Sequence, residues 1–342
     1  MGEALGEEAA AQEVAVLLGP GLNIQRSPLC GRDFEYFSED PILAGRMAAA
    51  YVRGIQKNGI SACPKHFAVN SQELRRMASD SVLDERTLRE LYLTGFEIVV
   101  KEAKPKTIMT SYNLINGTYA NENAHLLQDI LRKDWGFDGA VVTDWGGSND
   151  HALGVKNGST LEMPCPGGDS IRELMKAVQD GKISEADVDA RLDEMLELVL
   201  STHAAVEKAP RTFDAAAHHK LARRAAAESI VLLRNEGGIL PLKPNEKLAV
   251  IGDFAETPRY QGAGSSAVNA LQVDTLLDSI KADDSGITLV GYASGFERQG
   301  AADAEKLEEA VALAKKADTV LLCLGLDELR ESEGLDRSDI CL

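Results

Sequence analysis

The sequence has no apolar run long enough to cross a lipid bilayer, so we expect no membrane-spanning segment in these 342 residues. Cysteine is scarce as well: the five cysteines are odd in number, scattered, and form neither a CxxC pair nor a metal-ligand spacing. The opening MGEALGEEAAAQE is acidic, unlike a secretory signal. These absences predict reduced thiols, no metal site and a cytoplasmic location.

Positive charge is in short supply. The chain has 36 Lys and Arg against 54 Asp and Glu, a formal net charge of -18, which argues against nucleic acid or an anionic membrane as a partner. The glycine-serine loop Tyr260–Asn269, YQGAGSSAVN, lacks the lysine of a P-loop and the GxGxxG spacing, so we expect no nucleotide site. A small neutral or cationic ligand fits this composition better, and no pattern indicates an oligomeric state.

Strand, loop and helix patterns alternate through residue 200, which is typical of the βα repeat of a parallel sheet or barrel. Five strands are too few to close an eight-stranded barrel, and the deficit falls at the start of the chain. The expected strands are Val14–Leu18, Ile60–Phe67, Thr107–Asn113, Gly139–Gly147 and Thr160–Met163.

Helices are expected between these strands, and two carry clear N-terminal signals. Asp84 is expected to cap one helix, and Ser184 with Asp187 has the spacing of a capping box. The expected helices of this half are residues 4–12, Ile42–Lys57, Asp84–Glu102, His125–Trp135, Asp150–Lys156, Ser170–Asp180 and Ser184–Leu200.

After a loose connector, Ser201–Asp214, a second α/β region is predicted. It begins with an alanine-rich helix and continues with alternating strands and a further helix. Its expected elements are the helices Ala215–Glu228 and Ala302–Ala317 and the strands Leu248–Phe254, Ile287–Tyr292 and Thr319–Leu326.

The stretch Gly139–Gly147, GAVVTDWGG, places Asp144 at the end of a buried strand with Trp145 beside it. In a parallel α/β barrel, side chains at the C-terminal ends of strands point into a shared active-site face. A carboxylate there could act as a nucleophile, a base or a metal ligand, and a neighbouring indole could cover the apolar face of a sugar ring. The structural alternative is an aspartate that caps a strand-to-loop turn.

Cationic side chains occupy similar positions. Arg32 lies in the turn-rich stretch SPLCGRDFEYFSEDP, and Lys65 and His66 fall at the end of the strand Ile60–Phe67. An arginine fork binds hydroxyls or carboxylates, and a lysine in a strand end either pairs with a carboxylate or serves chemistry. Two alternatives stay open: an arginine that only pins its own loop, and Lys65 as the amine of a Schiff-base aldolase.

Seven stretches, spread in order over essentially the whole chain, together resemble glycoside hydrolase family 3 and specifically its β-glucosidase branch. They are GPGLNIQRSPLCGRDFEYFSEDP, CPKHFAVNSQE, TIMTSYNLING, GAVVTDWGG, SIVLLRNEGGILPL, QGAGSSAVN and SEGLDR. The resemblance implies an α/β protein in which a (β/α)8-type TIM barrel precedes an α/β sandwich. We accordingly expect a barrel domain over residues 1–204, incomplete at its start, a linker over 205–214, and a sandwich domain over 215–342, incomplete at its end. The chain would then be an internal fragment of a longer enzyme.

The resemblance also implies roles for single residues. Asp144 matches the nucleophile of a retaining glycosidase, and Glu333 in SEGLDR matches the acid/base. We expect Lys65, Arg32 and Arg76 to keep Asp144 ionised, and the like charges of Glu331 and Asp336 to raise the pKa of Glu333. The positions that match sugar-binding residues are Arg32, Lys65, His66, Arg76, Tyr112, Trp145 and Ser265.

The implied activity is release of β-D-glucose from the non-reducing end of β-glucosides or cello-oligosaccharides, with no metal or organic cofactor. Related activities of the family stay open: β-xylosidase, arabinosidase and N-acetylglucosaminidase. AVNSQE follows KHF here, instead of a glycine-rich loop with a His–Asp dyad, and SEGLDR is present, so a glucosidase is favoured over an N-acetylglucosaminidase. A further alternative is a non-catalytic truncated fragment.

Overall fold

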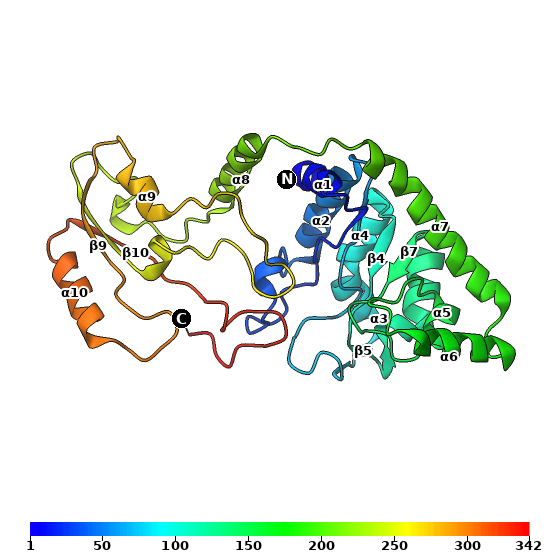
Figure 1. The fold of residues 1–342 in the computed structure, drawn as a ribbon. Coiled ribbons are helices and arrows are strands. Elements are labelled where there is room, and N and C mark those ends of the chain that lie inside the picture. The colour runs from blue at the N-terminus through cyan, green and yellow to red at the C-terminus, as the bar shows by residue number, and fades with distance from the viewer. Residues whose placement is uncertain (342) are drawn as a thin grey trace. The chain divides into compact units, whose positions relative to one another are not determined.

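The computed structural model describes residues 1–341 and divides into two compact units, Met1–Ala225 and Ala226–Leu342 (Figure 1). The boundary falls within helix α8 (Ala215–Ser229). Both units contain parallel strands connected through helices, so the predicted α/β class is confirmed. Among the helices of residues 1–341, none combines the length and the apolar character needed to span a membrane.

Five parallel strand segments, in sequence order, form the wall of the first unit. β1 pairs with β2 and β4 pairs with β7, while single bridges join Phe67 to Thr110 and Val142 to Leu161. Four of the five predicted strands are present in the expected order, although the paired segments are shorter than predicted; the fifth, Thr160–Met163, is reduced to a single bridge at Leu161. Their bounds are β1 (Val16–Leu17), β2 (Ser61–Ala62), β4 (Thr107–Met109), β7 (Ala140–Val142) and the single bridge at Leu161.

A small second sheet in this unit was not predicted. β3 runs parallel to β5, and β5 turns directly into the antiparallel β6. Asn116 and Gly117 form the two-residue turn, with φ of 51° and 85°, as an Asn-Gly hairpin turn requires. The strands are β3 (Asp80–Ser81), β5 (Leu114–Ile115) and β6 (Thr118–Tyr119).

The helices of the first unit lie where the sequence places them, and both capping predictions are confirmed. Asp84 accepts a hydrogen bond from the backbone of Thr87, and Ser184 and Asp187 form a full capping box. The helical bounds are α1 (Gly2–Ala11), η1 (Asp33–Glu35), α2 (Pro41–Gln56), α3 (Glu85–Thr87), η2 (Leu88–Leu93), α4 (Thr94–Ala103), η3 (Ala120–Glu122), η4 (His125–Asp134), α5 (His151–Asn157), α6 (Gly168–Gln179) and α7 (Glu185–Lys208).

The prediction of a loose connector from residue 201 is wrong in its first half, because α7 continues to Lys208 (green in Figure 1). The hydroxyl of Thr202 donates to the carbonyl of Leu198, and Val206 packs against the main core. The helix ends at Ala209, whose extended backbone conformation suits the proline that follows it. Packing against the core therefore carried the helix beyond the point that periodicity alone suggested.

Helix α2 packs closely against α4 because its inner face is built from small residues. Ala44, Ala48 and Ala49 have no exposed surface. A Cβ added to Gly45 would lie 3.0 Å from the Cα of Gly95 in α4. The two helix backbones thus approach at a distance that side chains would prevent, which fixes α4 behind the strands that carry the polar site.

The second unit contains a three-stranded parallel sheet in the order β10-β8-β9. Its core centres on Leu248, Val250 and Leu277. The three predicted strands and the predicted helix at 302–317 are present. Helix α9, which carries Leu277, was not predicted. The elements are η5 (Glu236–Gly238), β8 (Lys247–Ile251), η6 (Asp253–Ala255), α9 (Leu276–Lys281), β9 (Thr288–Ala293), α10 (Ala304–Ala314) and β10 (Thr319–Leu322).

The contact between α2 and α4 gives a stability prediction. Replacement Gly45→Leu should lower the free energy of unfolding of the first unit by about 1–3 kcal/mol, because the new side chain collides with the backbone of α4. Ala50→Leu, at an exposed position of the same helix, is the matched control and should change it by less than about 0.5 kcal/mol. Urea unfolding followed by circular dichroism measures both, and equal midpoints for the two variants would contradict the argument.

Candidate active site

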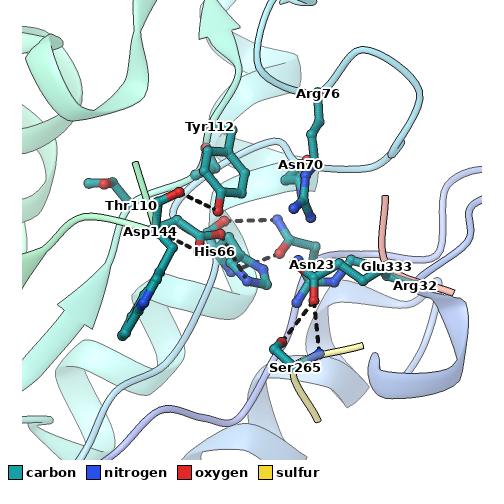
Figure 2. A network of polar contacts seen from close by, with 12 residues as sticks. Asn23, Arg32, His66, Asn70, Arg76, Thr110, Tyr112, Asp144, Ser265 and Glu333 are labelled. Atoms are coloured by element: carbon teal, nitrogen blue, oxygen red, sulfur yellow. Dashed lines mark hydrogen bonds and ion pairs between the residues drawn. The ribbon is translucent and has the colours of Figure 1, made fainter. Parts of the chain in front are cut away.

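Polar side chains that follow three neighbouring strands of the first unit meet around Asp144 (Figure 2). Asp144 lies two residues after the end of β7, His66 follows β2, and Tyr112 follows β4. The Nε2 atom of His66 lies 3.5 Å from Oδ2 of Asp144. The hydroxyl of Tyr112 donates to the carbonyl of Trp145 at 2.9 Å. The parallel strands therefore deliver these side chains to one edge of the sheet.

Asp144 is a buried carboxylate with two different oxygens. Oδ1 accepts a hydrogen bond from the backbone N–H of Trp145 at 2.8 Å. Oδ2 is also buried, and among residues 1–341 it makes no hydrogen bond of normal geometry. It instead faces the imidazole of His66, which leaves this oxygen available to a ligand.

Burial has a larger effect on the pKa of Asp144 than the nearby cations have. Burial raises the pKa of this carboxyl and outweighs the N–H of Trp145, the charges of Arg32 and Arg76 and the hydroxyl of Tyr112, all of which lower it. Of the three expected cations, Arg32 and Arg76 lower the pKa of Asp144 as predicted, whereas Lys65 is not among the main groups that shift it. The net shift is upward because of burial, whose depth the sequence could not give.

His66 is held in place through its own peptide. The side chain of Asn23 donates to the carbonyl of His66 at 2.9 Å and accepts from its N–H at 2.8 Å. Burial lowers the pKa of His66 well below its ordinary value, and the positive charges of Arg32, Lys65 and Arg76 act in the same direction. The imidazole is therefore neutral at physiological pH.

Arg76 is oriented by a carboxylate and lies over an aromatic ring. Its Nη1 donates to Oε2 of Glu73 at 2.7 Å, and its guanidinium lies 4.5 Å from the centre of the Tyr112 ring. Glu73 has a fully buried side chain and also accepts from the amide of Asn70 at 3.2 Å. This arrangement joins the loop after β2 to the loop after β4.

The other predicted residues of this unit differ in their surroundings. Arg32 is buried and pairs with Glu35 in η1. Lys65 is half-buried, and its positive charge lowers the pKa of His66. The side chain of Trp145 is 43% exposed, next to the buried carboxylate of Asp144. An exposed ring beside a buried charge can offer an apolar face to a ligand whose polar edge reaches the carboxylate.

In the second unit, the two predicted site residues, Ser265 and Glu333, form a hydrogen bond. The hydroxyl of Ser265 donates to Oε2 of Glu333 at 2.8 Å, across 68 positions in the sequence. Gly264 has a φ of 86°, and a Cβ at this position would lie 3.1 Å from the Cβ of Glu333, so glycine lets the loop approach. Glu331 pairs with Arg259 at 2.6 Å, so its charge is compensated and is not the simple like-charge neighbour that we expected.

Four residues that orient the candidate site were not predicted as site residues: Asn23, Asn70, Glu73 and Glu122. Glu122 is buried, and its Oε1 accepts from the backbone N–H groups of Asn149 and Asp150, which fixes the loop after Trp145. Burial raises the pKa of Glu122. A sequence signal exists for Asn23, a polar residue between the apolar Leu22 and Ile24; the other three lie in polar stretches that give no such signal.

No group of three or more His, Cys, Asp or Glu side chains in residues 1–341 is arranged to hold a metal ion. The donors around Asp144 are guanidinium, imidazole, hydroxyl and amide groups. They suit a neutral ligand that has several hydroxyls, because each can donate to or accept from such a group.

Asp144→Asn should stabilise the first unit at pH 7. Since burial raises the pKa of this carboxyl in the folded state, folding favours the protonated form, and the stability that the raised pKa provides is lost as the pH rises through the folded value. The neutral amide removes this loss, so we expect a melting temperature about 2–4 °C higher at pH 7 and a difference that shrinks toward pH 4. Thermal melts from pH 4 to 8 measure it; a lower melting temperature at pH 7 would contradict the assigned cause.

Comparison with known proteins identifies the family of the chain. Residues 1–198 match the model of the glycosyl hydrolase family 3 N-terminal domain, and residues 230–342 match that of its C-terminal domain. Thermostable beta-glucosidase B of Acetivibrio thermocellus is 45% identical over 100% of this chain and 45% of its own length. An exo-alpha-(1->6)-L-arabinopyranosidase of Bifidobacterium longum is 45% identical over 99% of this chain and 46% of its own.

Comparison with a solved structure leads to the same family. The family 3 beta-glucosidase of Bifidobacterium adolescentis superposes with a TM-score of 0.92 at 45% identity, over 98% of this chain and 49% of that one. The chain thus spans about half the length of the relatives it matches. Both domain models match in order and together cover most of the sequence. The chain belongs to glycosyl hydrolase family 3.

Proposed function

We propose that this chain carries the catalytic residues of a retaining β-glucosidase, which releases β-D-glucose from the non-reducing end of β-glucosides or cello-oligosaccharides. The observation that carries the proposal is the environment of Asp144. One carboxylate oxygen accepts a hydrogen bond from the backbone. The other is buried, makes no hydrogen bond within residues 1–341, and lies 3.5 Å from the neutral imidazole of His66. The names of two similar proteins, one curated and one of solved structure, support the substrate class.

The proposed chemistry divides hydrolysis into two steps. The carboxylate of Asp144 bonds to the anomeric carbon while the glycosidic bond breaks, and an acid protonates the departing oxygen. Water then attacks the anomeric carbon of the glycosyl-enzyme, the conjugate base of that acid takes the proton from water, and the bond between the sugar and Asp144 breaks. The first step needs an ionised Asp144, so the raised pKa of this group should limit activity on the acidic side.

We propose Glu333 as the acid/base and Ser265 as the group that orients it. The support within the second unit is the hydrogen bond from Ser265 Oγ to Glu333 Oε2. A serine hydroxyl can follow both protonation states, since it can donate to a carboxylate or accept from a carboxylic acid. This is a different use of Ser265 from the sugar contact that the family resemblance implied.

The sugar is proposed to lie among the polar groups of the first unit. Guanidinium and ammonium groups would donate to ring hydroxyls, and Trp145 would cover an apolar face of the ring. The preorganisation of Arg76 by Glu73 lowers the entropy lost on binding, because the guanidinium is already fixed. The proposed sugar-binding residues are Arg32, Lys65, His66, Arg76, Tyr112 and Trp145.

We also propose the domain division at residues 1–204, 205–214 and 215–342, with a barrel domain first and a sandwich domain second. The domain models that match 1–198 and 230–342 support this order. The last turn of α7 would then lie at the beginning of the linker.

A second candidate function has a specific observation in its favour. The arabinopyranosidase of Bifidobacterium longum is as identical to this chain as the glucosidase of Acetivibrio thermocellus, at 45%. Both activities could use the same two carboxyl groups and differ only in the contacts to sugar hydroxyls. β-Xylosidase and N-acetylglucosaminidase activities, and a chain without activity of its own, are the further alternatives.

The central test is hydrolysis of p-nitrophenyl glycosides by the purified chain. We expect the β-D-glucoside to be the best substrate, and Asp144→Asn to lower kcat roughly 10²–10⁴-fold, because an amide is a poor nucleophile. Asp129→Asn removes an exposed carboxylate and should leave the rate unchanged. The α-L-arabinopyranoside, the β-xyloside and the N-acetyl-β-glucosaminide, assayed in parallel, separate the alternatives. A folded chain that is silent on all four favours the non-catalytic alternative.

The role of Glu333 predicts a dependence on the leaving group. Glu333→Ala should slow hydrolysis of cellobiose, which needs a proton on its leaving oxygen, far more than attack on 2,4-dinitrophenyl β-D-glucoside, which does not. Azide should then restore turnover by forming the β-glucosyl azide. Glu308→Ala in α10 is the control with an exposed carboxylate. Equal slowing of both substrates would assign the acid/base to another residue.

A further inference from the structure

The ring of His66 has a hydrogen-bond partner on the side opposite Asp144. The hydroxyl of Tyr36, at the end of η1, is 3.3 Å from Nδ1 of His66, while Nε2 of the same ring is 3.5 Å from Oδ2 of Asp144. Tyr36 and His66 are 5% and 1% exposed, so bulk water does not reach this contact. The three side chains therefore form one buried chain from tyrosine through imidazole to carboxylate.

We propose that Tyr36 is a positioning residue that holds His66 in the Nε2–H tautomer, so that an N–H group and not a lone pair faces the carboxylate of Asp144. This inference rests on the proposed function only for its consequence in catalysis. The arrangement of the three side chains stands without it.

Counting protons on the ring leads to this tautomer. A neutral imidazole carries one N–H and one lone pair, and an ionised carboxylate only accepts. A proton on Nδ1 would leave the Nε2 lone pair facing the carboxylate of Asp144 across 3.5 Å. A proton on Nε2 removes that repulsion, and Nδ1 then needs a donor, which the hydroxyl of Tyr36 supplies.

The protonation states of Tyr36 and His66 agree with this arrangement. Burial raises the pKa of Tyr36 well above its ordinary value, so the hydroxyl keeps its proton and can donate it. A cationic imidazole would need both ring nitrogens to donate, and the charges of Arg32, Lys65 and Arg76 disfavour it. The neutral ring with a proton on Nε2 is the form that satisfies both neighbours.

The surrounding backbone leaves the ring little freedom. Asn23 clamps both polar groups of the His66 peptide, and the amide of Gln25 donates to the carbonyl of Tyr36 at 3.1 Å. The ring planes of Tyr36 and His66 meet at 72°, with 6.3 Å between centres, so the hydroxyl approaches the imidazole at its edge. Both partners are thus fixed before any ligand binds, as a precise hydrogen bond requires.

The consequence for catalysis is a single neutral donor beside the attacking oxygen. An N–H dipole steadies the carboxylate of Asp144 without forming an ion pair, which would hold its electrons more tightly. Loss of Tyr36 would leave Nδ1 buried without its donor and would weaken this orientation of the ring.

The test is the tautomer of His66 in the whole chain labelled with ¹⁵N-histidine. Long-range ¹H–¹⁵N spectra at pH 7 distinguish an Nε2–H ring from an Nδ1–H ring and from imidazolium, and the signals missing in His66→Asn assign the residue. We expect the Nε2–H form, and in Tyr36→Phe a clear shift of the Nδ1 signal or a mixture of tautomers. Tyr51→Phe, where a half-buried tyrosine packs on Phe37, is the matched control and should leave His66 unchanged.

An Nδ1–H ring or an imidazolium in the unmodified chain would overturn the proposal, and so would an unshifted His66 in a folded Tyr36→Phe. If that variant does not fold, the tautomer of the unmodified chain decides. With an active chain, Tyr36→Phe should lower kcat roughly tenfold with little change in KM, about the effect of losing one hydrogen bond. A chain without activity that shows the expected tautomer would count against the proposed function alone.

Discussion

Keeping a charged carboxylate buried at the end of a strand is the constraint on which the first unit depends. Burial raises the pKa of Asp144, and without compensation the group would lose its charge. The compensation comes from the N–H of Trp145, from two guanidinium groups and from the hydroxyl of Tyr112. Each of these belongs to a different loop or strand end, so the parallel wall of strands is what brings the compensation together.

The supporting side chains act mainly by fixing one another. Glu73 holds Arg76, whose guanidinium lies over the ring of Tyr112. The hydroxyl of Tyr112 in turn donates to the carbonyl of Trp145. Asn23 does the same for His66 through its peptide. Since side chains held at both ends lose little freedom when a ligand binds, such chains of contacts favour a preformed site.

In the second unit, the main polar contact of the candidate site joins a glycine-serine loop to Glu333. The parallel sheet of this unit carries that loop, in which Gly264 allows close approach and Ser265 bonds to Glu333. The neighbouring carboxylate of Glu331 is occupied by Arg259, so the acidic loop is not a cluster of free negative charges. Composition alone described this loop as acidic, whereas the pairing within it determines which carboxylate is held by a hydroxyl and which by a guanidinium.

The sequence by itself determined the element order, the capped helix starts at Asp84 and Ser184, and the motifs that name Asp144 and Glu333, because these depend on residues close together in the chain. The Asn116–Gly117 hairpin was readable in the same way but was overlooked. Tertiary structure alone decided how far α7 extends, which residues orient His66 and Arg76, and the direction of the pKa shift at Asp144. These properties depend on burial and on contacts between distant segments, which no local pattern records.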